Sequence, residues 1–106
     1  AVHSTTTQDL RAATEEFLGA ISAGNPGLKT LSRGAATVGG QPAESVLLEG
    51  PSTLGAAETE INWVVTVLRP KGLLAWVLVS PRSEFNDLRP LFGRIVSSVQ
   101  FAAGQR

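Results

Sequence analysis

Two adjacent segments of strongly β-forming residues constrain the fold of this chain more than any other feature. Residues 58–69 (ETEINWVVTVLR) place Ile, Trp and Val at alternate positions, a period of two that is typical of a strand. Residues 73–80 (LLAWVLVS) are apolar at almost every position, which predicts a strand covered on both faces and central in its sheet. The short PKG segment between them favours an antiparallel hairpin.

A second pair of strands, of weaker propensity, is expected before this hairpin. Residues 29–38 and 43–50 are interpreted as two strands. GGQP at 39–42 is the turn between them, because glycine reaches positive φ and proline interrupts pairing. Residues 51–57 (PSTLGAA) are expected to form a loop, from their Pro, Ser and Gly content.

The first helix is expected at about residues 7–23, after a polar leader at 1–6. A capping box of Thr5 and Gln8 would satisfy backbone N–H groups at its start, and Gly24 suits the residue that follows its end. Its apolar residues recur at helical spacing and form one stripe. The stripe consists of Leu10, Ala13, Phe17 and Ile21.

A second helix is expected at about residues 84–97, with Ser83 able to cap its start. Its apolar stripe keeps its phase across Pro90, so the helix is either kinked at this proline or begins there. The stripe consists of Phe85, Leu88, Phe92, Ile95 and Val99. The tail from Val99 is expected to add a short edge strand, and residues 102–106 are expected to fray.

Consecutive strands between two terminal helices indicate an α+β domain. We expect an antiparallel sheet of about four to six strands, with the N-terminal and C-terminal helices packed on it, rather than alternating βαβ units. The length of 106 residues suits a single domain over 1–106, and the 42% of hydrophobic residues argues against disorder.

The composition excludes several classes of function. Nine basic and nine acidic residues cancel, so the chain lacks the charge pattern expected for binding nucleic acid or an anionic membrane. No apolar run approaches the ~20 residues that span a bilayer. The absence of cysteine excludes disulfides, thiolate catalysis and zinc–thiolate sites. The chain begins with Ala1 and contains no methionine, which favours a trimmed or processed product.

A search for catalytic and metal-binding residues yields no candidate set. The single histidine, His3, lies in the expected leader, where an ordinary exposed residue is favoured over a general base. One histidine and scattered carboxylates do not provide the three protein ligands of a catalytic zinc site. We therefore predict no catalytic residue, no metal site and no cofactor.

Two pairs of carboxylates are further candidates for acid–base chemistry. Glu15 and Glu16 are adjacent on the first helix, so their side chains diverge by about 100° and cannot share a proton; a solvated face is favoured. Glu58 and Glu60 would lie on one face of a strand. An acid–base pair of a hydrolase is the functional alternative, and the solvent edge of a strand is favoured.

Glycine, tryptophan and arginine residues offer weaker candidates. GGQP lacks the following helix and the Lys-Ser/Thr of a phosphate-binding loop. Trp63 and Trp76 could stack on a ligand, but both lie in the strongest strands and a place in the core is favoured. Three arginines near the second helix are expected on a solvated face with Glu84 and Asp87 interspersed. They are Arg82, Arg89 and Arg94.

Three stretches of the chain carry a family resemblance: ATEEFLGAISAGNPGLK, VGGQPAESVLLEG and LLAWVLVSPRSEFNDLRPLFGRIVSSVQF. They are similar to the domain that follows the catalytic part of some bacterial zinc metallopeptidases of the HtpX-like gluzincin class. The resemblance covers residues 9–101 and consists of packing and turn positions. The matching residues are Asn25, Pro26, Leu28, Val38, Gly39, Gly40, Ala43, Pro81, Phe85, Leu88, Pro90, Phe92, Ile95, Ser98 and Val99.

More broadly, the order of helices and strands resembles the PsbP/Mog-type fold, an antiparallel sheet sandwiched by helices. The HExxH motif of the peptidases is absent, so the resemblance implies a non-catalytic accessory domain of a bacterial, extracytoplasmic protein, periplasmic or secreted, with a protein partner. Two alternatives stay open. One is a stand-alone binding or assembly protein, such as a processed lipoprotein. The other is a small-molecule-binding domain with a cleft between the second helix and the sheet near Trp63 or Trp76.

Overall fold

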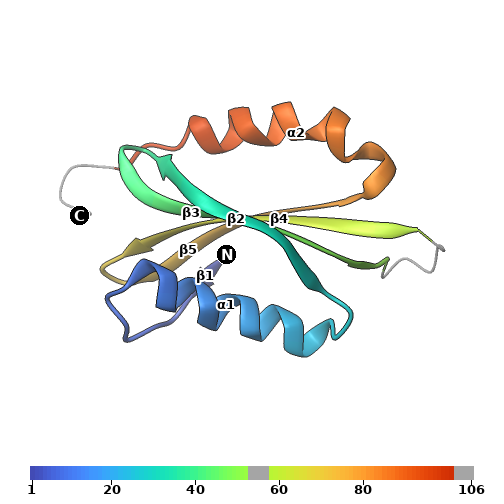
Figure 1. Cartoon of the computed structure of the whole chain (residues 1–106). Coiled ribbons are helices and arrows are strands. Elements are labelled where there is room, and N and C mark those ends of the chain that lie inside the picture. Colours follow the sequence, from blue (N-terminus) through green and yellow to red (C-terminus); the bar gives the residue numbers. More distant parts are fainter. Residues whose placement is uncertain (53–57, 102–106) are drawn as a thin grey trace.

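The computed structural model describes residues 1–52 and 58–101 and confirms the expected α+β class. A five-stranded antiparallel sheet of order β1-β5-β4-β3-β2 lies between two helices, one on each face (Figure 1). The elements are β1 (Val2–His3), α1 (Leu10–Gly24), β2 (Lys29–Val38), β3 (Gln41–Pro51), β4 (Thr59–Arg69), β5 (Gly72–Pro81) and α2 (Arg82–Ser97).

The strongest strand segments form the expected antiparallel hairpin, β4 with β5. The expectation that residues 73–80 are central in the sheet is wrong, because β4 occupies the centre and β5 has only the two-residue β1 on its outer side. Val77 and Val79 are 38% and 52% exposed on the face that carries α1, so the expected cover on both faces is incomplete at these positions. Leu73 and Ala75, earlier in the same strand, are buried.

The other expected hairpin joins β2 to β3 through Gly39 and Gly40, whose φ angles are +55° and +78°. Pro42 does not interrupt the pairing as expected, since it lies opposite Thr37 inside the ladder. Pairing of β3 with β4 begins only at Ala43, so no strand on that side requires an N–H from Pro42.

The strand β3 is therefore longer than the expected 43–50, and it includes Pro51. The rest of the expected loop at 51–57 falls mostly outside the described part of the chain, which omits residues 53–57.

The start of α1 differs from the expectation. The carboxylate of Asp9 is the N-cap and accepts a hydrogen bond from Ala12 N at 3.0 Å. The expected capping box is wrong, because Thr5 Oγ1 accepts from the backbone N–H two residues on and Gln8 precedes the cap. Gly24 is the last residue of the helix rather than the residue after it.

The second helix begins two residues before the expected 84 and continues through Pro90 to Ser97. Pro81 occupies the N-cap position without a side-chain hydrogen bond. Ser83 does not cap the helix as expected; its hydroxyl donates to Glu58 Oε1 at 2.5 Å. Pro90 is the ninth of the sixteen residues, so the alternative that the helix begins there is wrong. A proline in the interior has no N–H for the hydrogen bond to the carbonyl four residues earlier.

The expected leader at 1–6 contains a strand. Val2 and His3 pair with β5, and the amino group of Ala1 donates to Ala75 O at 2.8 Å. The edge strand expected from the C-terminal tail is not found among residues 98–101, and residues 102–106 lie outside the described part. The sheet therefore gains its short edge strand at the N-terminus instead.

The core consists of two layers, one on each face of the sheet. The layer under α1 contains Leu18, Val46, Leu48 and Val64. The layer under α2 contains Val38, Ala43, Val65, Val67, Phe92 and Val96. Both faces of β4 are thus buried, which explains its place at the centre. Neither helix within residues 1–52 and 58–101 is long and apolar enough to cross a membrane.

Candidate functional site

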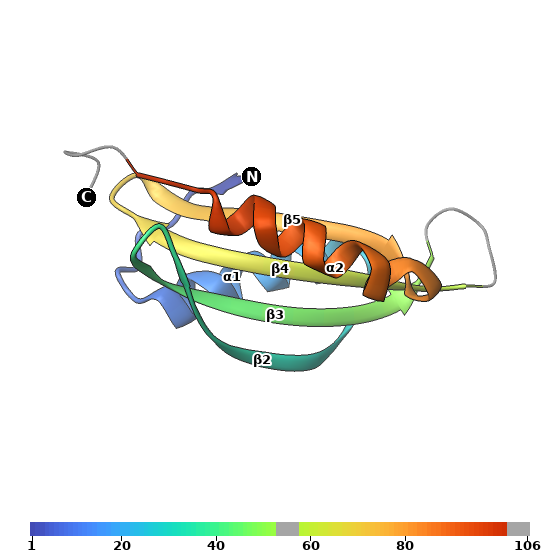
Figure 2. The same cartoon turned by 90° about the horizontal axis from the view of Figure 1, so that it is seen from above.

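The face of the sheet that carries α2 is only half covered. α2 packs on β4 and β5, while β2 and β3 lie beside it (Figure 2). The pairing register places Gly34 opposite Ser45, and Ala36 opposite Ala43, on this face. Ala43 is buried in the layer under α2, whereas Gly34 and Ser45 are small residues of the half that α2 leaves open, which is therefore shallow.

A hollow of about 270 Å³ lies where this open half meets the helix. Its floor is made by Ser32 and Gly34 of β2 and by Ser45 and Leu47 of β3. Trp63 of β4 and Arg89 of α2 form its wall, and Arg33 and Ala35 of β2 also border it. The residues come from four elements, and the hollow therefore exists only in the folded chain.

Trp63 is held firmly at this place. Its indole Nε1–H donates to Ser45 Oγ at 2.8 Å. Its ring packs against Phe92 and Phe85 of α2, with centroids 4.9 Å and 6.0 Å away. The expected core position of Trp63 is thus half correct, because the ring supports α2 and also borders the hollow.

Arg89 extends over the aromatic wall. Its guanidinium carbon lies 5.5 Å from the centroid of Trp63 and 5.9 Å from that of Phe85, within the range of cation–π attraction. No carboxylate of the described residues forms an ion pair with it. Arg89 therefore contributes a positive charge that the described part of the chain does not neutralise locally.

Arg33 provides a contrast on the opposite face. From β2 it donates to Glu44 of β3, with Nε 3.0 Å from Oε1, and it pairs with Glu15 of α1. The side chains of Arg33 and Glu44 are only 16% and 14% exposed. Burial disfavours the charged guanidinium, but hydrogen bonds and Coulombic attraction from the two carboxylates prevail and raise the pKa of Arg33 above its ordinary value.

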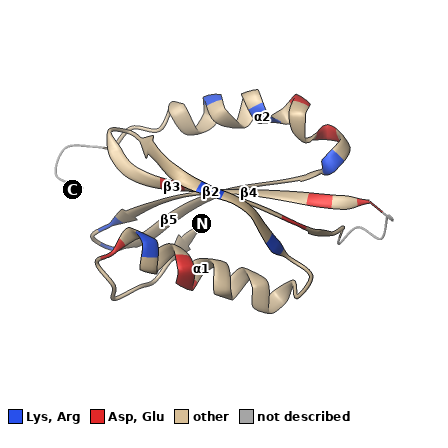
Figure 3. Cartoon of the chain, in the orientation of Figure 1, with Lys and Arg blue, Asp and Glu red and all other residues tan. Residues whose placement is uncertain are grey.

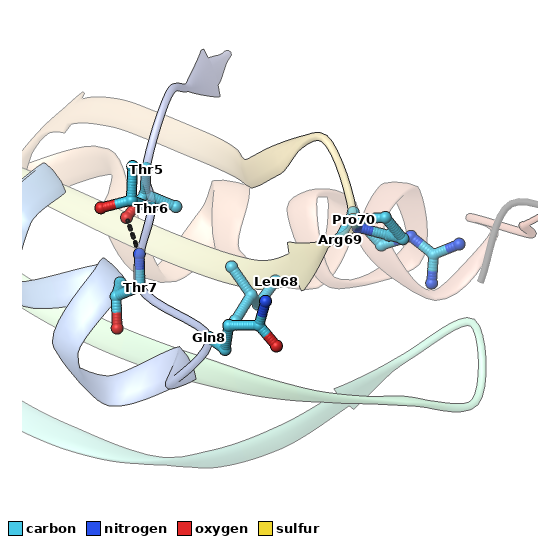
Figure 4. Close-up of a pocket in the computed structure, with 7 residues that line it drawn as sticks. All are labelled: Thr5, Thr6, Thr7, Gln8, Leu68, Arg69 and Pro70. Carbon is cyan, nitrogen blue, oxygen red and sulfur yellow. Dashed lines mark hydrogen bonds between the residues drawn. The ribbon is translucent and has the colours of Figure 1, made fainter.

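A second hollow, of about 390 Å³, lies between the segment before α1 and the β4–β5 turn (Figure 4). Its lining is polar: three threonines and a glutamine, with Leu68, Arg69 and Pro70. The guanidinium of Arg69 is turned toward Phe101, 4.2 Å from its ring centroid. The hydroxyls of Thr5 and Thr7 accept backbone N–H groups of the local turns. Because Arg69 is engaged with Phe101, the hollow presents mainly neutral polar groups to a ligand.

The remaining predicted candidates are dispersed. His3 is not a loose residue, since its Nε2 lies 3.3 Å from Glu16 Oε1 and its ring packs edge-on against Phe17. Glu15 pairs with Arg33, so the two helix carboxylates have basic partners rather than only solvent. Both helices carry charged residues of both signs (Figure 3).

The strand carboxylates also differ from the expected solvent edge. Glu58 precedes β4 and accepts the hydrogen bond from Ser83, whereas Glu60 is buried in β4 beside a hollow of about 300 Å³ that Asn25 and Ser52 also line. No group of three or more His, Asp or Glu residues that could hold a metal occurs within residues 1–52 and 58–101.

The arginines of the second helix are exposed as expected, but they are not equivalent. Arg82 pairs with Glu49 of β3 at 3.2 Å, and Arg89 lies over Trp63. Their partners differ because of the way α2 crosses the sheet. The sequence shows that Trp63 and Arg89 are present, but it does not indicate that they meet. Trp76, the second candidate, is half-buried under α2 and does not line this hollow.

Compared with models of known protein families and with curated proteins, the chain matches none of them.

Proposed function

We propose that the chain is a non-catalytic interaction domain, an accessory part of a bacterial, extracytoplasmic zinc metallopeptidase of the HtpX-like class. The resemblance of residues 9–101 to the domain that follows the catalytic part of such enzymes supports this role. The catalytic part, or a substrate bound to it, is the proposed partner. The chemistry then belongs to the HExxH segment and not to this chain.

The observation that carries an interaction role is the long free edge of β2. This strand runs from Lys29 to Val38. Within residues 1–52 and 58–101 it pairs with β3 alone, and neither helix covers its outer side. An unpaired edge exposes a row of backbone N–H and C=O groups that another strand can join. Lys29 and Leu31 are exposed along it, which adds charge and apolar surface to the backbone groups.

The gene sequence provides the first test. The proposal expects a signal for export and an HExxH-bearing segment in the same reading frame, before this domain. A reading frame without HExxH would exclude the proposal that this domain is part of a peptidase. A reading frame that contains a lipoprotein signal and no further domain would favour a stand-alone binding protein.

A binding measurement tests the edge directly. In a two-residue hairpin the pair that closes the turn, here Val38 and Gln41, is hydrogen-bonded. The N–H groups of β2 point alternately toward β3 and away from it, so the N–H of Ala35, three residues before Val38, points away from β3. Ala35→Pro should remove one edge donor and weaken binding of the catalytic segment about tenfold or more in calorimetry. Ala35→Val, which keeps the N–H, is the matched control and should bind as the unmodified chain does.

Equal binding by both variants would contradict the proposed edge. Their melting temperatures show whether Ala35→Pro remains folded, as expected for proline at an edge position.

A further inference from the structure

The hollow beside Trp63 combines the positive charge of Arg89 with apolar and hydroxyl-bearing walls. Arg89 is exposed and has no carboxylate partner among the described residues, but its position is constrained by two aromatic rings. Arg33 also borders the hollow, but its charge is balanced by Glu15 and Glu44, and the remaining lining residues are uncharged. An anion that enters the hollow therefore meets the preorganised guanidinium of Arg89, and no carboxylate lines the hollow to repel it.

Hydroxyl groups extend this polar side. Ser45 Oγ accepts the indole N–H of Trp63, and its own O–H hydrogen donates to no described residue. A serine hydroxyl donates one hydrogen and accepts with two lone pairs, so Ser45 remains able to donate to a ligand. Ser32 lines the same floor from the neighbouring strand.

The apolar side comes from the sheet. Leu47 and Trp63 are partners in the β3–β4 register and lie next to each other on this face. Gly34 has no side chain, and a Cβ added to it would meet nothing within 4 Å. The space above Gly34 is therefore open, and it borders an apolar wall.

We propose that this hollow binds a small carboxylic acid with an apolar body. The carboxylate pairs with Arg89 and accepts from Ser45, and the apolar body lies over Gly34 against Leu47 and Trp63. A planar guanidinium with several N–H donors matches a carboxylate in geometry and charge. This proposal concerns the chain alone and stands whether or not the domain belongs to a peptidase.

The size of the hollow restricts the ligand. Its volume of about 270 Å³ is just below the range of ~300–1,000 Å³ that is usual for ligand sites. A monocarboxylate with about ten non-hydrogen atoms fits such a space, and a folded partner does not. Affinity in the high-micromolar to millimolar range is expected for a ligand this small.

The test is a titration of the purified full chain with 3-phenylpropionate and with its uncharged counterpart, 3-phenylpropanamide. The indole N–H signal of Trp63 in ¹H–¹⁵N NMR spectra reports on the hollow, and that of Trp76, which does not line it, is an internal control. We expect a saturable shift of the Trp63 signal with the acid, and at least about tenfold weaker binding of the amide.

Three variants assign the binding to these residues. Arg89→Gln should weaken binding of the acid about tenfold, with Arg89→Lys intermediate because an ammonium is a point charge. Arg94→Gln, on the same helix but outside the hollow, is the matched control and should bind normally. Gly34→Leu should fill the hollow and abolish binding while the chain stays folded.

Several results would overturn the proposal: no saturable shift of the Trp63 signal, equal affinity for acid and amide, or equal losses in Arg89→Gln and Arg94→Gln. Because the titration needs no catalytic segment, its failure is distinct from failure of the proposed edge interaction.

Discussion

Arg33 and Arg89 approach the same β2–β3 half of the sheet from opposite faces, and their surroundings differ. Arg33 ties β2 to β3 and α1 through Glu44 and Glu15. Arg89 contacts two aromatic rings, and no described carboxylate pairs with it. An arginine whose charge is balanced inside the domain contributes to its architecture, whereas one beside a hollow without a counter-charge is available to a ligand.

The coverage of the two faces differs in the same way. α1 packs on β3, β4 and β5, and Arg33 bridges from its flank to β2. α2 packs on β4 and β5, and no ion pair of the described residues connects it to β2. On one face a charge network therefore links the helix to β2, and on the other face the described residues form no such link.

The largest effect is expected at the apolar contact that holds α2 in place. Phe92 is buried and packs against Trp63 with a centroid distance of 4.9 Å. Phe92→Ala should destabilise the chain by about 3–4 kcal/mol in urea unfolding, through lost burial and a cavity. Leu91→Ala, at a half-exposed neighbour, is the control and should cost less than about 1 kcal/mol. Similar losses would mean that α2 is not anchored through Phe92.

The charge network on the other face should give the next largest effect. Arg33→Met leaves the half-buried Glu44 without its partner, and a loss of about 2 kcal/mol in the free energy of unfolding is expected. The double variant Arg33→Met/Glu44→Leu should recover part of that loss, because an apolar pair does not leave a buried charge unpaired. If Arg33→Met were as stable as the unmodified chain, Arg33 would not have the structural role that distinguishes it from Arg89.

A smaller effect is expected at the buried hydrogen bond between α1 and β4. Thr14 Oγ1 donates to Leu10 O at 2.8 Å, so the 2.8 Å contact with Thr66 requires Thr66 to donate. Thr14→Val should cost about 1–2 kcal/mol, because the Thr66 hydroxyl loses its acceptor. Adding Thr66→Val should restore some stability. Additive losses in thermal unfolding would argue against direct coupling of the two hydroxyls.

The smallest effect on stability is expected at Arg89 itself. Arg89→Gln removes only exposed cation–π contacts and should change the free energy of unfolding by about 0.5 kcal/mol or less. Chemical denaturation of Arg89→Gln and Arg33→Met under the same conditions compares their free energies of unfolding. A loss at Arg89 as large as that at Arg33 would show that both arginines are structural.

The candidate site was much harder to predict than the fold. Trp63 was expected in the core because it alternates with other apolar residues, and that expectation holds for the side of its ring that meets Phe85 and Phe92. Arg89 was expected on a solvated face. Nothing in the spacing of these residues indicates that they meet, because the angle at which α2 crosses the sheet places them together.

The amino-acid sequence by itself determined the α+β class, both hairpins and both helices, since these depend on local periodicity and on glycines at the β2–β3 turn. Only the tertiary structure decided that β4 is central and that Val2 and His3 form an edge strand. It also decided which arginine has a counter-charge. Periodicity reports which faces of an element are buried, whereas strand order and helix placement depend on which buried faces meet.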